Sequence, residues 1–492
     1  MSHPVQYRWV IRDINRGGIM GSLSDFLYMI DDFMWGSWMT ILILSTGIIL
    51  SVCFKFRYQR KIAFNFRNTF AKMLSPGEGE GTVSGFRAAC TALANTVGTG
   101  NISGVATAIV SGGPGALVWM WISAFFGMST KACEIIIGQR YREHYKESMN
   151  EYVCDRSFVL KNAFGWKKGA VVLAVFCFMF GPWTCCVQTE AVTSSMKEAF
   201  GLPSVVTVII IGITCMVTIW GGLKRISGVM SKAVPIMAVL YIVMGLGVII
   251  INWREIPAVV ALVFRSAFSP VAAAGGFAGA TVRDAIQFGV ARGIYSNDAG
   301  TGYGMIAHAS AKTDHPVRQS LWGWGEVFID TFIICAVTAF TIIMTGSYYT
   351  SDATSGALTT IAFTNAYGGI GGKLTAIAIT VFAWTTIIGM YYTCEKSVNY
   401  AFGDTERNKK MMPLYMVYYM VPCVIFYNIE ADVLWAFTDI LSAVYVLITI
   451  FIIAARHKEI FRLFRDYWDR YLPAKERGEN PPYVSFDCHE EE

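Results

Sequence analysis

The sequence predicts an all-helical membrane protein with eleven transmembrane helices: one N-terminal helix, then a five-plus-five inverted repeat with two discontinuous helices. Three observations predict this class. Hydrophobic residues make up 54% of the 492 residues and charged residues only 15%, whereas soluble domains carry roughly 25% charged residues. Apolar runs of about the 20 residues that span a bilayer recur along the whole chain. Basic residues gather in every second loop, as expected of a chain that crosses a membrane repeatedly.

The predicted spans follow from these apolar runs. In order, they cover residues 33–54, 82–111, 115–139, 169–196, 203–221, 230–252, 272–310, 322–346, 372–400, 413–428 and 432–455. The second, seventh and ninth are longer than a bilayer requires. The first 24 residues are mixed and polar, and they lack the basic-then-apolar pattern of a signal peptide.

Loop charge predicts the orientation of the spans. Lys and Arg gather after the first, third, fifth, seventh, ninth and eleventh spans, whereas segments 111–115, 346–372 and 428–432 are poor in cations. Cytoplasmic loops carry the excess of cations. We therefore expect a multi-pass protein of the plasma (inner) membrane, in contact with the lipid bilayer, with its N-terminus outside and its C-terminus in the cytoplasm.

Three regions are predicted. Residues 1–81 form an N-terminal segment with the extra transmembrane helix and a basic cytoplasmic loop. Residues 82–455 form the core, in two five-span halves, 82–252 and 272–455, whose odd number of spans gives them opposite orientations. Residues 456–492 form a cytoplasmic tail, read as an amphipathic helix on the inner membrane surface followed by a disordered polar end.

The composition argues against several other classes. The net charge of +5 is modest and lies in loops, so nucleic acid is not an expected partner. The twelve cysteines include no CxxC pair and no His/Cys metal spacing. All but Cys154 and Cys488 lie in apolar spans, which indicates reduced, lipophilic side chains. His308 and His315 are interpreted as hydrogen-bonded surface groups. No catalytic triad or phosphate loop is present, so we expect neither an enzyme nor a cofactor.

The functional prediction depends on the stretch Thr96-Val97-Gly98-Thr99-Gly100-Asn101 in the second span. Glycine weakens a helix interior by about 1 kcal/mol relative to alanine, and in a bilayer every freed N–H and C=O needs a partner. In an unwound helix, the amides near Gly98 and Gly100 suit a carboxylate. The carbonyls of Ala94 and Val97 and the Asn101 side-chain oxygen suit a cation. Close helix packing through the glycines is the structural alternative. The run GTGNISG lacks the spacing and βαβ context of a dinucleotide fingerprint.

A matching interruption, Tyr295-Ser296-Asn297-Asp298-Ala299-Gly300, lies in the seventh span. Two interrupted helices at corresponding places in two halves are typical of a transporter binding site. A carboxylate at membrane depth indicates function, so Asp298 is expected to face a substrate ammonium group or to carry a proton. A structural pair with Arg292 or Arg283 is the alternative. A zwitterionic amino acid fits such a site because its two charges match the two helix ends.

Two other spans contribute polar candidates. Gln188 brings a donor and an acceptor into the fourth span, and Glu190, two residues later, faces another side. Thr385 and Thr386 lie in the middle of the ninth span, where hydroxyl oxygens suit sodium as they suit other hard cations. Hydrogen bonds from these hydroxyls back to the preceding turn are the alternative.

Four further charges lie inside predicted spans. Lys131 and Glu134 are three residues apart and Glu326 and Asp330 are four apart, so each pair shares a helix face. We interpret both as structural or gating pairs.

At these residues the sequence resembles the alanine/glycine:cation symporter family, also called sodium:alanine symporters. The strongest segments are NTVGTGNISGVATAIVSGGPGALVWMWISAFFGMST (residues 95–130) and residues 275–346, which include GVARGIYSNDAG, HASAKTDHPVRQ and EVFIDT. The match extends from Gly81 to about Gly403. The resemblance implies a leucine-transporter-type fold, an inverted five-helix repeat with one extra N-terminal helix. It also implies inward transport of small neutral amino acids with sodium or sometimes protons.

The resemblance also implies site residues. Those expected to bind substrate are Thr96, Gly98, Gly100, Gln188, Tyr295, Ser296, Asn297, Asp298 and Thr386. A sodium ion is expected between the carbonyls of Ala94 and Val97 and the hydroxyls of Thr385 and Thr386, and a second cation at Asn101.

Four departures from the family pattern affect the substrate prediction. Asp298 stands where the family usually has Glu, Thr301 where it has an apolar residue, Glu190 where it tends to have Asn, and Met390 where Trp is usual. Met390 lies one turn after Thr386 and is smaller and more flexible than Trp, so we expect it to line a wider pocket. Alanine or glycine is the family default, and a larger or more polar amino acid is the alternative.

Two other functions are compatible with the sequence. Asp298 and Glu190, both able to titrate in a low-dielectric site, motivate a proton-coupled transporter of the same fold. The long basic loop 140–168 and the aromatic tail motivate a non-transporting amino-acid sensor or a channel.

Overall fold

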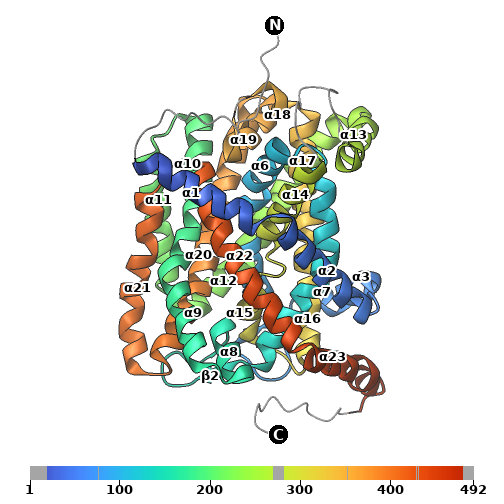
Figure 1. The fold of residues 1–492 in the computed structure, drawn as a ribbon, viewed down its shortest axis with the longest axis vertical. Coiled ribbons are helices and arrows are strands. Elements are labelled where there is room, and N and C mark those ends of the chain that lie inside the picture. Colours follow the sequence, from blue (N-terminus) through green and yellow to red (C-terminus); the bar gives the residue numbers. More distant parts are fainter. Residues whose placement is uncertain are drawn as a thin grey trace.

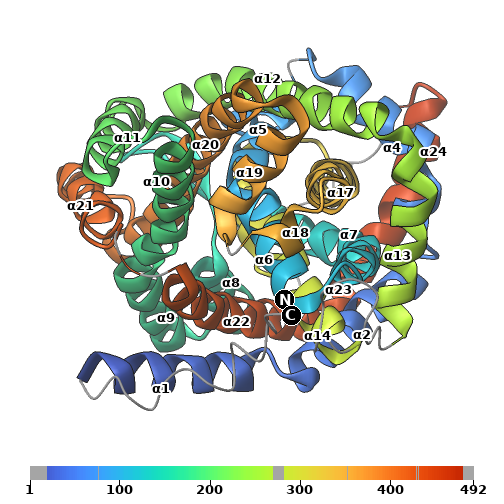
Figure 2. The same ribbon diagram turned by 90° about the horizontal axis from the view of Figure 1, so that it is seen from above.

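The computed structural model describes residues 19–75, 77–269, 282–351, 353–427, 429 and 431–479. Most of these residues are helical, and the long helices run side by side along the long axis of the molecule (Figure 1). Seen from above, α5 (Gly85–Thr96) and α6 (Ser103–Gly112) lie near the centre, and other helices surround them (Figure 2). The predicted helical class is therefore observed, with a pair of interrupted helices in the interior.

The N-terminal segment holds more helix than the sequence predicts. α1 (Ile19–Met34) begins before the predicted first span and joins α2 (Ser37–Cys53) at Trp35 and Gly36. Together they form a 31-residue apolar stretch, Leu23–Cys53, long enough to cross a membrane. The loop that follows contains α3 (Arg57–Arg60), α4 (Ile62–Asn68) and the 3₁₀ turn η1 (Phe70–Lys72). Residues 1–18 lie outside the described residues.

The first half of the core contains the first broken helix. α5 and α6 are separated by the 3₁₀ turn η2 (Thr99–Asn101). The elements that follow are α7 (Ala116–Arg140), β2 (Glu143–Tyr145), β3 (Glu151–Val153), α8 (Arg156–Phe164), α9 (Lys167–Phe180), η3 (Gly181–Cys185), α10 (Cys186–Phe200), α11 (Ser204–Ile219), α12 (Gly222–Ile251), η4 (Trp253–Glu255) and α13 (Ile256–Phe268). The predicted fourth span is thus two helices joined by a bend that contains Pro182, as expected where proline removes a backbone donor.

The second half contains the second broken helix. α14 (Val282–Asn297) and α15 (Tyr303–Ala309) are separated by five non-helical residues. The remaining elements are β4 (Ala311–Lys312), α16 (Pro316–Val327), the π-helical segment η5 (Phe328–Cys335), α17 (Ala336–Met344), α18 (Ser347–Thr350), α19 (Ser355–Tyr367), α20 (Gly369–Phe402), α21 (Glu406–Ile425) and α22 (Ala431–Ala455). The beginning of the predicted seventh span, up to residue 281, lies outside the described residues.

Seven helical stretches of the described chain are long and apolar enough to span a membrane, and Ser204–Ile219 is a shorter apolar helix. This establishes a multi-pass membrane protein. The count of eleven spans, the inverted repeat and the orientation of the termini stay predictions.

Short strands join segments at one end of the bundle. β1 (Val83–Ser84) pairs in parallel with β4, so the chain entering α5 lies beside the chain leaving α15. β2 and β3 form an antiparallel hairpin. Arg142 reinforces the first pairing, because its guanidinium donates to the carbonyls of Glu80, Ala309 and Ala311. The strand pairing therefore connects α5 of the first broken helix with α15 of the second.

The described part of the C-terminal tail is helical. α23 (His457–Asp466), the π-helical η6 (Tyr467–Tyr471) and α24 (Leu472–Glu476) form an arm at the lower end of Figure 1. The aromatic face of the arm packs on protein: Phe464 contacts Phe54 and Tyr58, and Trp468 contacts Phe64. The arm therefore covers the loop after α2. The tail from residue 480 lies outside the described residues.

Candidate substrate and cation site

The first helix unwinds where the glycines predict. α5 ends at Thr96, and Gly98 adopts extended backbone angles (φ −143°, ψ −152°). The side chain of Asn101 closes the unwound turn, because its Oδ1 accepts the Gly98 N–H at 2.8 Å. The buried Gly98 amide, which makes no regular helical hydrogen bond, is thus bonded to a side chain. Inside a bilayer each backbone N–H needs such a partner.

The second helix unwinds through backbone angles that favour glycine. Asp298 has φ +55°, Gly300 has φ +107° and Gly302 has φ +85°. The freed amides of this break are satisfied from α7, whose Glu134 carboxylate accepts the N–H groups of Gly300 at 2.5 Å and Gly304 at 3.1 Å. A carboxylate at the start of α15 also complements the positive end of that half-helix.

The two breaks lie against each other. Asn95 Nδ2 donates to the Asp298 carboxylate at 3.2 Å. A Cβ added at Gly100 would come within 3.1 Å of the Tyr295 ring, so the first break approaches the second closely only because Gly100 has no side chain. The predicted convergence of the two interruptions is therefore observed.

Gln188 connects both breaks from α10. Its Oε1 accepts the hydroxyl of Thr99 at 2.6 Å and the Thr99 N–H at 3.3 Å, and its Nε2 donates to the Tyr295 hydroxyl at 3.4 Å. In this conformation the amides of Gly98 and Thr99 are therefore bonded to protein side chains, and a ligand carboxylate would replace these bonds.

Thr386 of α20 lies beside the first break, whereas the neighbouring Thr385 has Met237 of α12 within 3.4 Å of its hydroxyl. A Cβ at Gly98 would lie 2.1 Å from Thr386 Oγ1, and one at Gly389 would meet backbone atoms of Ala94 and Asn95 at 3.0–3.2 Å. Both threonine hydroxyls donate to the Phe382 carbonyl, at 2.8 and 2.9 Å, as in the structural alternative for these residues. Each of these bonds uses the hydrogen of the threonine hydroxyl and leaves the lone pairs of the hydroxyl oxygen available to a cation. The Thr386 hydroxyl beside the first break therefore offers an oxygen, the ligand type that hard cations prefer.

Asp330 is a site residue that the sequence assigned to another role. Its carboxylate accepts from Asn101 Nδ2 at 2.5 Å, Ser296 Oγ at 2.8 Å and Thr331 Oγ1 at 2.9 Å. The predicted pair with Glu326 is absent from the described contacts because η5 begins between the two residues and a π-helical turn changes which residues share a face. The signal available in the sequence was an acidic residue at membrane depth.

Five other predicted residues have specific neighbours. Thr96 is buried, and its hydroxyl reaches the Leu93 carbonyl at 3.4 Å. Asn297 accepts the Ala299 N–H and donates to Thr331, so it caps the second break.

The Met390 sulfur faces the hydroxyl of Thr184 at 3.6 Å and the thiol of Cys185 at 3.7 Å. Glu190 accepts a hydrogen bond from Ser355 of α19, and its described hydrogen bonds do not reach the breaks. Thr301 donates back to the Asp298 carbonyl.

Several predicted pairings are wrong. Lys131 forms its ion pair with Glu326 (4.0 Å) instead of Glu134, which binds backbone amides. His308 is fully buried and bonded to Glu326 at 2.7 Å, and His315 is fully buried and caps α16, so neither is a surface group. Arg292 pairs with Asp439 at 2.7 Å rather than with Asp298. Cys154 lies in the loop between β3 and α8, as predicted, and is buried.

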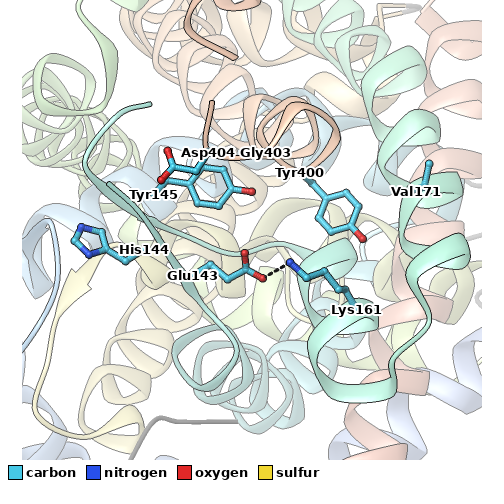
Figure 3. A pocket seen from close by; sticks show the side chains of 8 residues that line it. All are labelled: Glu143, His144, Tyr145, Lys161, Val171, Tyr400, Gly403 and Asp404. Atoms are coloured by element: carbon cyan, nitrogen blue, oxygen red, sulfur yellow. Dashed lines mark hydrogen bonds and ion pairs between the residues drawn. The ribbon is translucent and has the colours of Figure 1, made fainter. Parts of the chain in front are cut away.

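A separate pocket of about 410 Å³ lies beyond the end of α20. Figure 3 shows its lining residues, Glu143, His144, Tyr145, Lys161, Val171, Tyr400, Gly403 and Asp404. Its charges are already satisfied: Lys161 pairs with Glu143 at 2.7 Å, and Asp404 accepts backbone N–H groups of Glu147 and Ser148. Burial alone would raise the pKa of Asp404, but these hydrogen bonds lower it below its ordinary value. None of the predicted site residues lines this pocket.

Comparisons with known proteins agree with this geometry. A family model described as the sodium:alanine symporter family matches residues 20–481. An uncharacterized transporter of Haemophilus influenzae is 35% identical over 91% of this chain and 97% of its own. The sodium/alanine symporter AgcS of Methanococcus maripaludis is 35% identical over 84% and 90%, and the probable sodium/glutamine symporter GlnT of Bacillus subtilis is 30% identical over 94% and 93%.

Among solved structures, a Na⁺-coupled sialic acid symporter in a substrate-bound outward-open state matches with a TM-score of 0.50 at 13% identity, over 88% of this chain and 86% of that chain. At this identity the match shows the fold alone. The broken helices, the family model and the relatives together show a transporter rather than an enzyme, and the chain belongs to the sodium:alanine symporter family.

Proposed function

We propose that the protein is a secondary active symporter that imports a small neutral amino acid, with alanine or glycine as the family default, driven by a sodium gradient through alternating access. The observation that carries this proposal is the contact between two interrupted helices at Asn95, Gly100, Tyr295 and Asp298. Interrupted helices that meet at membrane depth present opposite dipole ends to a ligand. The relatives named for sodium and alanine or glutamine support an amino acid as the substrate.

The substrate carboxylate is placed at the amides of Gly98, Thr99 and Gly100. Two of these amides are held by side chains of Asn101 and Gln188, so binding exchanges these hydrogen bonds for bonds to the substrate. The ammonium group is placed toward Asp298, which is buried and bonded to the neutral Asn95 amide. The charge of a buried carboxylate that is bonded to a neutral amide would be stabilised by the ammonium group of a bound substrate.

The sodium ion is placed between the Ala94 and Val97 carbonyls and the hydroxyls of Thr385 and Thr386. A second cation is placed next to Asn101, where Asp330 supplies a formal negative charge and Ser296 a further oxygen. Higher ligand charge strengthens binding of a hard cation. The sodium ion and the second cation are proposed as cargo that binds and leaves with the substrate, and we expect no cofactor.

The proposed topology has eleven spans, a five-plus-five inverted repeat, an outside N-terminus and a cytoplasmic C-terminus in the inner membrane. The hairpin β2–β3, α8 and the C-terminal arm lie at the same end of the bundle (Figure 1), and the loops that contain them are basic. A common basic end supports its assignment to the cytoplasm.

Proton coupling is the second candidate, and one observation favours it. A buried chain runs from Lys131, 3.4 Å from the Asn297 carbonyl, through Glu326 to His308. Glu190, another basis for this alternative, accepts a hydrogen bond from Ser355 and has no described hydrogen bond to either break. Replacing sodium by choline during liposome uptake separates the two candidates, since unchanged uptake would exclude sodium coupling.

The substrate itself is tested by competition. A panel of twenty amino acids is competed against binding of labelled alanine to the purified protein. Preference for alanine, glycine and serine supports the family default, and preference for glutamine supports a larger polar substrate. Sodium-dependent binding without concentrative uptake would favour the sensor or channel.

A further inference from the structure

A buried ion pair ties α14 to α22 beside the second break. Arg292 Nη1 lies 2.7 Å from both Asp439 oxygens, and both side chains are less than a tenth exposed. The guanidinium also lies over Trp435, 4.3 Å from the ring centroid. Trp435 in turn meets Tyr295 edge to face at 4.7 Å. We call Arg292, Asp439 and Trp435 the outer gate cluster, because they lie next to Tyr295 on the side proposed to face outside.

The joint between α1 and α2 packs directly on this cluster. Trp35 is buried at the joint, and its indole N–H donates to the Asp439 backbone carbonyl at 2.9 Å. The Trp35 ring belongs to an apolar cluster with Val290 and Ile294 of α14 and Ala443 of α22. Both ribbon views show α1 lying beside α22 (Figures 1 and 2). The extra N-terminal helices therefore touch both helices that the ion pair joins.

Asp31, one turn before Trp35, brings a second carboxylate to the same place. Its carboxyl lies near enough to Asp439 and Arg292 to be influenced by the charges of both. Among the described residues, the buried Asp31 Oδ1 and the buried Arg292 Nε have no hydrogen-bond partner. Arg292 thus gives Nη1 to Asp439 and keeps Nε unpaired within the described chain, while Asp31 offers a second carboxyl group from the neighbouring helix.

We propose that the α1–α2 pair is a working part of the outer gate, in which Trp35 holds Asp439 for the closed state and Asp31 receives Arg292 in the open state. This inference rests on the proposed alternating access. Separating α14 from α22 would strand a buried guanidinium, and breaking a buried pair is strongly unfavourable. A second carboxylate on a neighbouring helix stabilises the open state and so makes opening accessible. Trp35 and Asp31 are positioning residues that act through Arg292 and Asp439.

Cys186 provides a reporter, since it is buried in the same small cluster as Trp435. In a variant that keeps Cys186 as its sole cysteine, labelling by a membrane-impermeant maleimide from outside measures opening of the gate. We expect Asp439→Asn and the milder Trp35→Phe to speed labelling, and Asp31→Asn to slow it by about tenfold, because the two carboxylates favour opposite states. Asp25→Asn is the matched control, since Asp25 is an exposed carboxylate on the same helix.

Opposite changes in the labelling rate of Cys186 distinguish a gating role from a structural one. A loss of packing would increase the labelling rate in every variant. Labelling of Asp31→Asn at the rate of Asp25→Asn, or faster, would overturn the proposal. Trp35→Phe keeps the test valid if Asp439→Asn does not fold. The labelling assay does not depend on transport. Absence of sodium-driven uptake in the parent protein would contradict the proposed function, whereas the labelling rates would still test the proposed gate.

Discussion

Asn95 in the first broken helix donates a hydrogen bond of 3.2 Å to the carboxylate of Asp298 in the second. The two residues are 203 positions apart, and both are buried. Asn95 Oδ1 is buried and has no hydrogen-bond partner among the described residues. Such an unsatisfied acceptor is unfavourable by about 1–3 kcal/mol, which suits a contact that forms and breaks as ligands arrive. This contact joins the two interruptions on which the proposed mechanism depends.

Replacing Asp298 by Asn is expected to abolish concentrative amino-acid uptake with little loss of expression. The change removes the charge proposed to hold the substrate ammonium group, and charge-assisted hydrogen bonds contribute about 1.5–3 kcal/mol each. Uptake into proteoliposomes measures the effect. Asp298→Glu, which restores the residue usual in the family, is the control and should retain uptake. Normal transport by Asp298→Asn would contradict the assignment.

Replacing Gly98 by Ala is expected to impair transport because the new methyl group would meet Thr386 Oγ1 at 2.1 Å. Overpacking of this kind costs about 1–3 kcal/mol, and here it separates α20 from the first break. Gly104→Ala is the control in the same broken helix, since its methyl group would make only ordinary contact, 3.5 Å from Trp435. Comparison of maximal uptake rates checks this. Equal rates in the two variants would show that the close approach has no role.

Replacing Met390 by Trp is expected to narrow the substrate range. Met390 lies one turn after Thr386 and contacts Thr184 and Cys185, so a larger ring there fills space next to the first break. The affinity of the protein for glutamine should fall about tenfold, which corresponds to roughly 1.4 kcal/mol of steric exclusion. The affinities for alanine and glycine should stay unchanged. Competition binding with the three amino acids measures the change. Parallel loss for all three would indicate misfolding rather than selectivity.

The C-terminal arm is expected to detach in acid. Hydrogen bonds from Arg318 and Lys475 hold the pKa of Glu78 at about 2 instead of 4.5. A hydrogen bond from His315 holds the pKa of Asp466 at about 2 instead of 3.8. Because folding depresses both values, this stabilisation is complete above pH 4.5 and is lost as pH falls toward 2.

A nitroxide on Glu476→Cys, an exposed position of α24, reports the mobility of the arm in this window. Adding Asp466→Asn should make the arm more mobile near neutral pH and weaken the pH response. An arm that is released near pH 7, or that stays immobile at pH 2, would contradict the role of these pairs.

Much of the fold was predictable from the sequence because local signals specify it. Both breaks coincide with glycine and polar residues inside apolar spans, and α7, α11, α20 and α22 lie where the apolar runs predict. The helices α13 and α19 were missed because each is shorter than a membrane span and lies in a predicted loop. The early start of α1 was missed because polar residues interrupt its apolar pattern.

The contacts of the candidate site were only partly predictable. Gln188, Tyr295 and Asp298 each contact the first break. Asn95, Glu134 and Asp330 were assigned no site role, because their partners lie on helices far away in sequence. The π-helical η5 shifts Asp330 off the face it would share with Glu326 in a regular helix. Such a local change of helix type has no dependable signature in one sequence.

The most direct test of the central claim is uptake, under an inward sodium gradient, of the amino acid that competes best in the binding panel. The wild type is compared with Thr386→Ala and with Thr380→Ala, whose hydroxyl bonds to the Ala376 carbonyl on the same helix. We expect sodium-dependent accumulation by the wild type and Thr380→Ala, and none by Thr386→Ala or when choline replaces sodium. Equal accumulation in choline, or full activity of Thr386→Ala, would contradict a sodium ion held between the first break and α20.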